Sequence, residues 1–270
     1  MANEQIIGNR RVVIRIGNHH LSFSTIDPMQ VENSVTYEPY VVKSGMSMAA
    51  NLREALKGAG LAGMGIRRVQ VLLDVPVLMI PVEQFEEKSM VDMYNHSFPN
   101  REQDVVLYNV LPDLNAVTVF SMNKDLKLVI DDNFSDVKLI VAMSPVWRLL
   151  HQRSFTGARN KLYGCFHEQK LDIFSFHQNR FKFCNQFEVH HAHDALYFLL
   201  YVWKQLMLQQ ENDELHLVGE LPEQEWLMGE LKKYVQKAYV INPSAEFNRA
   251  PATKVKGMPF DLMTLLTKGR

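Results

Sequence analysis

The sequence predicts an α/β protein built from two similar halves, each with a mixed β-sheet flanked by helices. Three observations predict this class. The chain has 270 residues, 47 % hydrophobic and 22 % charged, a balance typical of soluble globular proteins. Short apolar runs typical of buried strands alternate with amphipathic segments typical of surface helices. The same order of elements (three strands, helix, strand, helix, strand) also occurs twice along the chain.

The first half opens with a hairpin around Gly17-Asn18-His19-His20 and continues with a helix that Ser47 caps and Gly58 ends. Its expected elements are strands at 11–16, 21–26 and 37–42, the capped helix, a strand at 69–73, a helix at 123–134, a strand at 137–143 and a helix starting at Ser144-Pro145. Residues 76–122 interrupt this order and predict an inserted subdomain. Within it we expect a strand at 77–82, a helix at 86–98 and strands at 104–110 and 116–122 around a turn at 111–115.

The second half repeats the order without repeating residue identities. Its expected elements are strands at 161–166 and 171–176 around a four-residue turn at 167–170, a strand at 181–187, a helix at 191–208, a strand at 215–218, a helix at 223–235, a strand at 238–241 and a terminal helix at 259–267. The polar segment 244–257 between the last two elements is expected to be irregular, either a solvated connector or a segment that orders on a partner. We therefore expect one half at 1–157 and the other at 158–270.

The charge balance and the apolar segments exclude several classes of function. The net charge of -1 gives no electrostatic reason to bind nucleic acid or acidic membranes. Two cysteines are too few for a disulfide framework and indicate a reducing compartment. The start of the sequence lacks the pattern of a signal peptide, and the apolar run 195–203 is far shorter than the about 20 residues of a spanning helix. We expect a cytoplasmic protein without direct membrane insertion.

The order of elements over residues 8–243 resembles a family of Bacteroidetes proteins of unknown function with the actin-like ATPase fold, which has two ribonuclease-H-like halves. More distantly, the layout is similar to the actin-like subunits of bacterial secretion and pilus assembly platforms. The resemblance implies that two hairpin turns, with patterns like D-x-G-T and D-x-G-G-G-T, would clamp the phosphates of a nucleotide. It also implies a Gly-Gly pair that packs on the adenosine.

At these positions the chain departs from the patterns of the superfamily. In the first turn Gly17 and Asn18 remain, but Arg15 stands where the acidic residue belongs, and a guanidinium cannot ligate a cation. In the second turn Gly164 is the only glycine, and the bulky Phe166 and His167 follow it.

The Gly-Gly pair of the superfamily falls at Gly219-Glu220. We therefore expect a relic nucleotide cleft at Gly17, Asn18, Gly164, Gly219 and Glu220. Since no other phosphate-binding loop appears in the sequence, the departures predict a protein without ATP hydrolysis.

Three other groups of residues allow a chemical interpretation beside a structural one. The cluster His190-His191-Ala192-His193-Asp194 offers either metal ligands or a polar helix start, and we favour the helix start, with no metal. Cys165 and Cys184 read as small hydrophobic residues of strands more readily than as a nucleophile or redox pair. The carboxylates Asp172, Asp194 and Glu220 form a nuclease-like set only if the fold brings them together.

Three hypotheses for function follow. The first is a non-catalytic scaffold or interaction protein that holds an unidentified protein partner, for which the insertion is a candidate surface. Whether the chain also forms a homo-oligomer is left open by the sequence. The second is an ATP-binding protein, an ATPase or kinase, that uses ATP with magnesium in an altered site. The third is a metal-dependent hydrolase that uses residues 190–194. We favour the first, with no cofactor.

Overall fold

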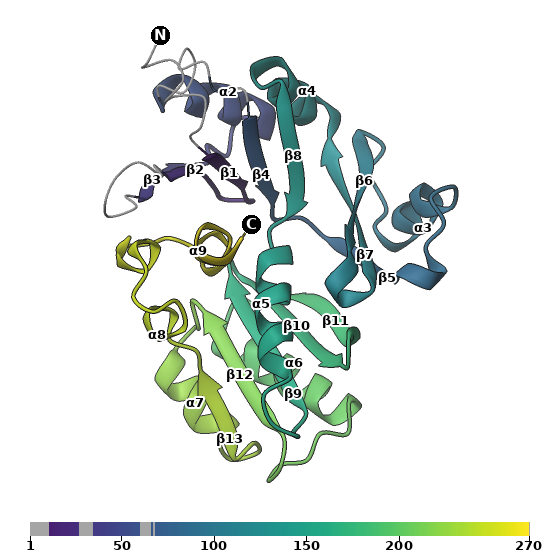
Figure 1. Cartoon of the computed structure of the whole chain (residues 1–270), viewed down its shortest axis with the longest axis vertical. Coiled ribbons are helices and arrows are strands. Elements are labelled where there is room, and N and C mark those ends of the chain that lie inside the picture. The colour runs from purple at the N-terminus through teal and green to yellow at the C-terminus, as the bar shows by residue number, and fades with distance from the viewer. Residues whose placement is uncertain (1–10, 27–34, 60–65, 67, 270) are drawn as a thin grey trace. The chain divides into compact units, whose positions relative to one another are not determined.

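The computed structural model describes residues 11–26, 35–59, 66 and 68–269, which divide into two compact units (Figure 1). The first unit comprises the spans Met1–Val110, Val117–Ser144 and Ala250–Met258, and the second comprises Leu111–Ala116, Pro145–Arg249 and Pro259–Arg270. The division falls at the start of helix α5 (Ser144–Ser154), between Ser144 and Pro145. The reason is packing, because the Trp147 ring of α5 lies edge-on to Phe181 of the second sheet, with ring centroids 5.6 Å apart.

The first unit contains a five-stranded mixed sheet with the order β3-β2-β1-β4-β8. The strands are β1 (Arg11–Ile16), β2 (His20–Ile26), β3 (Val35–Val41), β4 (Arg68–Leu73) and β8 (Asp136–Val141). β1 pairs antiparallel with β2 and parallel with β4, so it lies at the centre of the sheet. This position explains why its apolar side chains, among them Val13 and Ile14, are fully buried.

Helices α2 (Met48–Gly58) and α4 (Lys124–Asn133) pack against each other in this unit. Ser47 caps α2 as predicted, because its hydroxyl accepts a 3.2 Å hydrogen bond from the Ala50 N–H. Asn123 caps α4 in the same way, since its side-chain oxygen accepts from the N–H groups of Asp125 and Leu126. The sequence therefore determines the starts of both helices locally.

The insertion forms a three-stranded sheet with the order β5-β7-β6 and one helix, α3. Its elements are β5 (Val77–Pro81), α3 (Met90–Ser97), β6 (Asp104–Leu111) and β7 (Ala116–Asn123). The prediction that α3 begins at residue 86 is wrong, because a turn closed by a hydrogen bond from the Ser89 hydroxyl to the Glu86 carbonyl precedes it. The Asn109 amide of β6 bonds the Leu139 carbonyl and the Val141 N–H of β8, which connects the insertion to the edge of the larger sheet.

The second unit repeats the sheet of the first, with the order β11-β10-β9-β12-β13. Its strands are β9 (Lys161–His167), β10 (Lys170–His177), β11 (Arg180–Glu188), β12 (Glu214–Gly219) and β13 (Lys237–Val240). Helices α6 (Ala192–Gln205) and α7 (Gln224–Leu231) cover one face in a shared apolar core, and α8 (Pro243–Glu246) and α9 (Phe260–Lys268) follow β13. The two sheets have the same strand order and the same parallel and antiparallel pairs, which confirms the predicted duplication.

Several predicted boundaries in the second unit are wrong. Helix α7 ends at Leu231, because the chain tightens into three-residue turns there and leaves Lys232 and Lys233 beyond the helix. Helix α6 ends at Gln205, and Met207 takes a left-handed conformation with φ of 53°. The segment expected to be irregular at 244–257 contains α8 and a 3-10 turn at Pro251–Lys254. Over the described residues, we find no helix with both the length and the apolar character needed to span a bilayer.

Candidate functional site

The turn between β1 and β2 contains Gly17, which is buried, and Asn18, which is exposed. The Gly17 N–H donates a 2.9 Å hydrogen bond to the carbonyl of His20, which already belongs to β2. The turn therefore spans three residues, one fewer than predicted. Backbone hydrogen bonds, among them one from the Val42 N–H to the His19 carbonyl, hold it closed.

Arg15 lies in β1, two residues before Gly17, and forms a buried ion pair. Its Nη2 atom lies 3.3 Å from Oδ2 of Asp74, and only 2 % of either side chain is exposed. Asp74 follows β4 directly, and its backbone N–H donates to the Ile16 carbonyl, so the β1/β4 pairing places the two charges together. Sequence analysis found Arg15 but missed Asp74, although an aspartate directly after a buried strand is a recognisable signal.

The turn between β9 and β10 consists of Glu168 and Gln169, both with positive φ, 44° and 62°. The predicted four-residue turn is wrong, because His167 and Lys170 pair with each other and extend the ladder. A two-residue turn with positive φ at both positions matches the right-handed twist of the flanking strands. Glycine or asparagine usually occupies such positions. At the base of the turn Nε2 of His167 forms a hydrogen bond with Asp172, whose carboxylate also accepts from the Gln186 amide.

Gly164 lies in the middle of β9, and its role there is packing. A Cβ atom on Gly164 would lie 2.8 Å from the Leu217 side chain and 3.3 Å from Leu171 and Leu199. The glycine therefore lets β9 approach α6 closely within the apolar core.

Gly219 and Glu220 lie at the end of β12, beside the end of β9. Gly219 has φ of +97°, and a Cβ atom on it would lie 2.0 Å from the carbonyl oxygen of Phe166. The exposed Glu220 donates its backbone N–H to that same oxygen at 3.3 Å. The structure thus brings Gly219, Glu220 and Phe166 together within the second unit, while Gly17 and Asn18 belong to the first.

The histidine cluster 190–194 starts helix α6, as the structural interpretation expects. Oδ2 of Asp194 accepts the backbone N–H groups of His191 at 2.9 Å and His190 at 3.1 Å, which lowers the pKa of Asp194. The His193 ring lies against Trp226, with centroids 4.2 Å apart. Among the residues described, no group of three or more His, Cys, Asp or Glu side chains is arranged to hold a metal ion.

The remaining candidates have separate structural roles. Asp172 pairs with His167, Asp194 caps α6 and Glu220 lies at a strand end, each on a different element. Cys165 and Cys184 are both thiols. Burial, with the Asp172 charge as a smaller cause, raises the pKa of Cys184 and makes its thiolate unfavourable.

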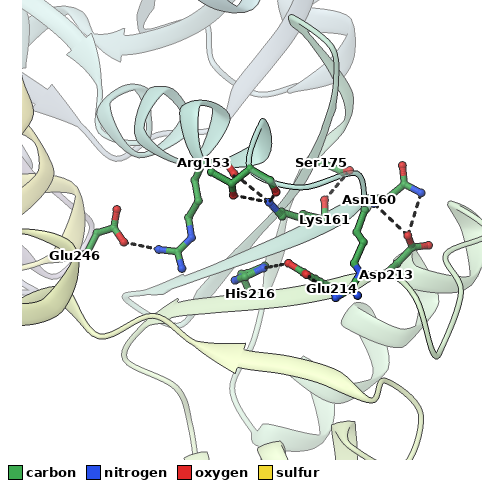
Figure 2. Close-up of polar contacts among 10 residues, drawn as sticks. Arg153, Asn160, Lys161, Ser175, Asp213, Glu214, His216 and Glu246 are labelled. Atoms are coloured by element: carbon green, nitrogen blue, oxygen red, sulfur yellow. Dashed lines mark hydrogen bonds and ion pairs between the residues drawn. The ribbon is translucent and has the colours of Figure 1, made fainter.

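A polar cluster on the other face of the second sheet escaped sequence analysis (Figure 2). Nε2 of His216 lies 2.9 Å from Glu214 in β12. The ammonium of Lys161 donates to the carbonyls of Arg153 and Thr156 at the end of α5, and Arg153 pairs with Glu246 of α8. These contacts fasten α5 and α8 to the sheet. A positive charge at the carboxyl end of a helix is also favourable.

Burial controls the electrostatics of this cluster. It lowers the pKa of Lys161 and the pKa of His216. Burial also opposes ionisation of Glu214, but the hydrogen bond from His216 and the charges of His216 and Lys161 outweigh it and lower the pKa of Glu214. Within the described chain, Nδ1 of His216 and the hydroxyl of Tyr163 are buried without a hydrogen-bond partner. The sequence signal of this cluster is the alternation of polar and apolar residues within β9 and β12.

The repeated sheets define the chain as a protein with the actin-like ATPase fold. A Bacteroides thetaiotaomicron VPI-5482 protein of unknown function with that fold is similar over 99 % of both chains, with 28 % identity and a TM-score of 0.84. The chain belongs to the family described as "Protein of unknown function (DUF3822)", whose model matches residues 2–238. These findings confirm the resemblance stated above.

A more distant match shows the fold alone. A chain of the PilM-PilN type IV pilus biogenesis complex matches with 13 % identity and a TM-score of 0.53, over 87 % of this chain and 89 % of the other. The comparison with curated proteins gave no match. The family and the fold are therefore established, and the relatives supply no activity.

Proposed function

We propose that this protein is a non-catalytic member of the actin-like fold, a cytoplasmic scaffold or protein-interaction module with a degenerate nucleotide site. The observation that carries the proposal is the buried Arg15–Asp74 ion pair at the end of β1. Magnesium-nucleotide chemistry needs carboxylates that ligate the ion or its waters. Here the position expected to supply one holds a guanidinium, and the adjacent carboxylate compensates that charge.

The second hairpin supports the same conclusion. Its tip contains Glu168, which adds negative charge where the resemblance assigns a phosphate, and the exposed Glu220 adds another nearby carboxylate. The glycines that remain have structural explanations, since Gly164 packs under α6 and Gly219 avoids the Phe166 carbonyl. These residues do not fit ATP with magnesium, so we assign no step through that cofactor.

The inserted subdomain is our candidate surface for a protein partner. Several of its large apolar side chains are exposed, namely Val82, Val91, Met93, Tyr108 and Val110. A chain of the PilM-PilN type IV pilus biogenesis complex shares the fold, which supports a protein as the class of partner. The two thiols are consistent with the proposed cytoplasmic location.

A thermal-shift titration with ATP and ADP, with and without magnesium, tests the proposal. A ligand that binds only the folded state at 100 times its Kd adds about 2.7 kcal/mol of stability, which raises the melting temperature by several degrees. We expect no shift up to millimolar nucleotide, while an active actin-like ATPase measured in parallel shifts. A saturable rise that depends on magnesium would contradict the proposal and favour an altered ATP site near Gly17, Gly164 and Gly219.

A further inference from the structure

The outward face of α6 is aromatic where the equivalent helix of the first unit is charged. α2 and α6 each follow the third strand of their sheets, and each packs on the next helix of the repeated order, α4 or α7. α2 exposes Arg53, Glu54 and Lys57. α6 instead exposes Tyr197 by 62 % and Tyr201 by 48 %.

The two tyrosines form a continuous surface. They lie four residues apart on one side of the helix, and their rings stack with centroids 6.0 Å apart and planes 17° apart. Residues 195–203 contain no charged side chain. The opposite side of α6, including Leu199 and Val202, is buried in the core of the second unit. A helix that is apolar on all sides is normally covered on all sides, so this face indicates a contact outside the chain.

We propose that α6 pairs with α6 of a second copy of this chain, in antiparallel orientation, around a two-fold axis between Tyr197 and Tyr201. In that register Tyr197 faces Tyr201 of the second copy. Asp194 and Lys204 each lie three residues beyond a tyrosine, so Asp194 faces Lys204 of the second copy, and symmetry creates this contact twice.

The charged residues at the two ends of α6 favour a second copy of this chain as the partner. The N–H groups of His190 and His191 hold the Asp194 carboxylate in place, and they lower its pKa, so it is anionic at neutral pH. Lys204 is exposed at the other end of the helix. The face thus has an acid at one end, a base at the other and an uncharged centre. Antiparallel packing also places opposite ends of the two helix dipoles together.

The available area predicts a reversible dimer. A buried aromatic side chain contributes roughly 150–250 Å², so two half-exposed tyrosines supply about 200 Å² per copy. Stable interfaces of standard size bury about 800 Å² per partner, so the tyrosines supply about a quarter of such an interface and weak, concentration-dependent dimerisation is expected.

Sedimentation velocity over about 1 to 500 μM protein tests the dimer. We expect concentration-dependent dimerisation that Tyr197→Ser/Tyr201→Ser weakens at least tenfold. Tyr234→Ser is the matched control, because Tyr234 is 54 % exposed in the same unit but lies outside α6. Circular dichroism checks that each variant is folded. A monomer at every concentration, or a dimer that the double variant leaves unchanged, would overturn the proposal.

A charge reversal tests the register. Lys204→Glu places a carboxylate opposite Asp194 of the second copy, so we expect at least tenfold weaker dimerisation, with a smaller difference in high salt. Lys57→Glu on the exposed side of α2 is the control and leaves the dimer unchanged. Equal dimerisation of the Lys204→Glu variant and the wild type would overturn the antiparallel register.

Discussion

Asp74→Asn is expected to destabilise the first unit by about 3 kcal/mol, because it removes the carboxylate charge 3.3 Å from the buried Arg15 guanidinium. Both side chains are only 2 % exposed and their charged atoms lie 3.3 Å apart. At an effective dielectric constant of about 20, two unit charges at that distance attract by about 5 kcal/mol. The asparagine oxygen still accepts a hydrogen bond, which offsets part of the loss, and Arg15 cannot relieve the cost by losing its proton.

The double variant Arg15→Met/Asp74→Leu separates this cause from general damage. It removes both charges and keeps an apolar pair of similar volume, so its stability is expected within about 1 kcal/mol of wild type. Unfolding in urea should be followed by hydrogen exchange of the β1 and β4 amides. Tryptophan fluorescence cannot serve here, because Trp147, Trp203 and Trp226 all belong to the second unit.

Two results would refute this reasoning. One is a cost below about 1 kcal/mol for Asp74→Asn, which would mean that the ion pair contributes little and that water reaches Arg15. The other is a double variant as unstable as the sum of the single variants, which would mean that the two side chains do not act as a pair.

Three further predictions concern the second unit. Burial lowers the pKa of His216, so near pH 6.5 the unfolded chain binds a proton at this histidine while the folded chain does not. The free energy of unfolding therefore falls as the pH drops below about 6.5. Urea unfolding followed by tryptophan fluorescence should show this dependence on pH, and the variant His216→Gln should reduce it. Gly219→Ala should lower the stability by at least about 2 kcal/mol, because the new Cβ would lie 2.0 Å from a backbone oxygen. The control is Gly229→Ala in α7, where the space is open, and it should be neutral or stabilising by up to about 1 kcal/mol. Equal effects of the two substitutions would contradict this account of Gly219. Asp194→Ala should lower stability by about 1 kcal/mol through the lost cap, and a chelator should leave the melting temperature unchanged; a fall on chelation would revive the metal hypothesis.

The local features of the fold were predictable from the sequence. Ser47 before the first helix and the apolar β4 run are signals that neighbouring residues determine, and both are confirmed. The order of elements also predicted two equivalent sheets, because strand and helix periodicities differ clearly in this chain.

The candidate site was only partly predictable, because its partners are distant in sequence. Arg15 and Asp74 meet through parallel pairing of β1 with β4, which no local pattern encodes. His216 and Tyr163 are neighbours for the same reason, in the pairing of β12 with β9. The end of α7 depended on which hydrogen bonds the backbone forms after Leu231, and the charge pattern of the sequence suggested a longer helix.

Calorimetric titration of the purified protein with ATP in excess magnesium tests the central claim most directly. The account predicts no binding heat beyond dilution at about 1 mM nucleotide, equivalent to a Kd weaker than about 1 mM. Saturable binding with a stoichiometry near one nucleotide per chain, abolished by removing magnesium, would contradict it. Such a result would mean that the Arg15–Asp74 pair is compatible with a working nucleotide site.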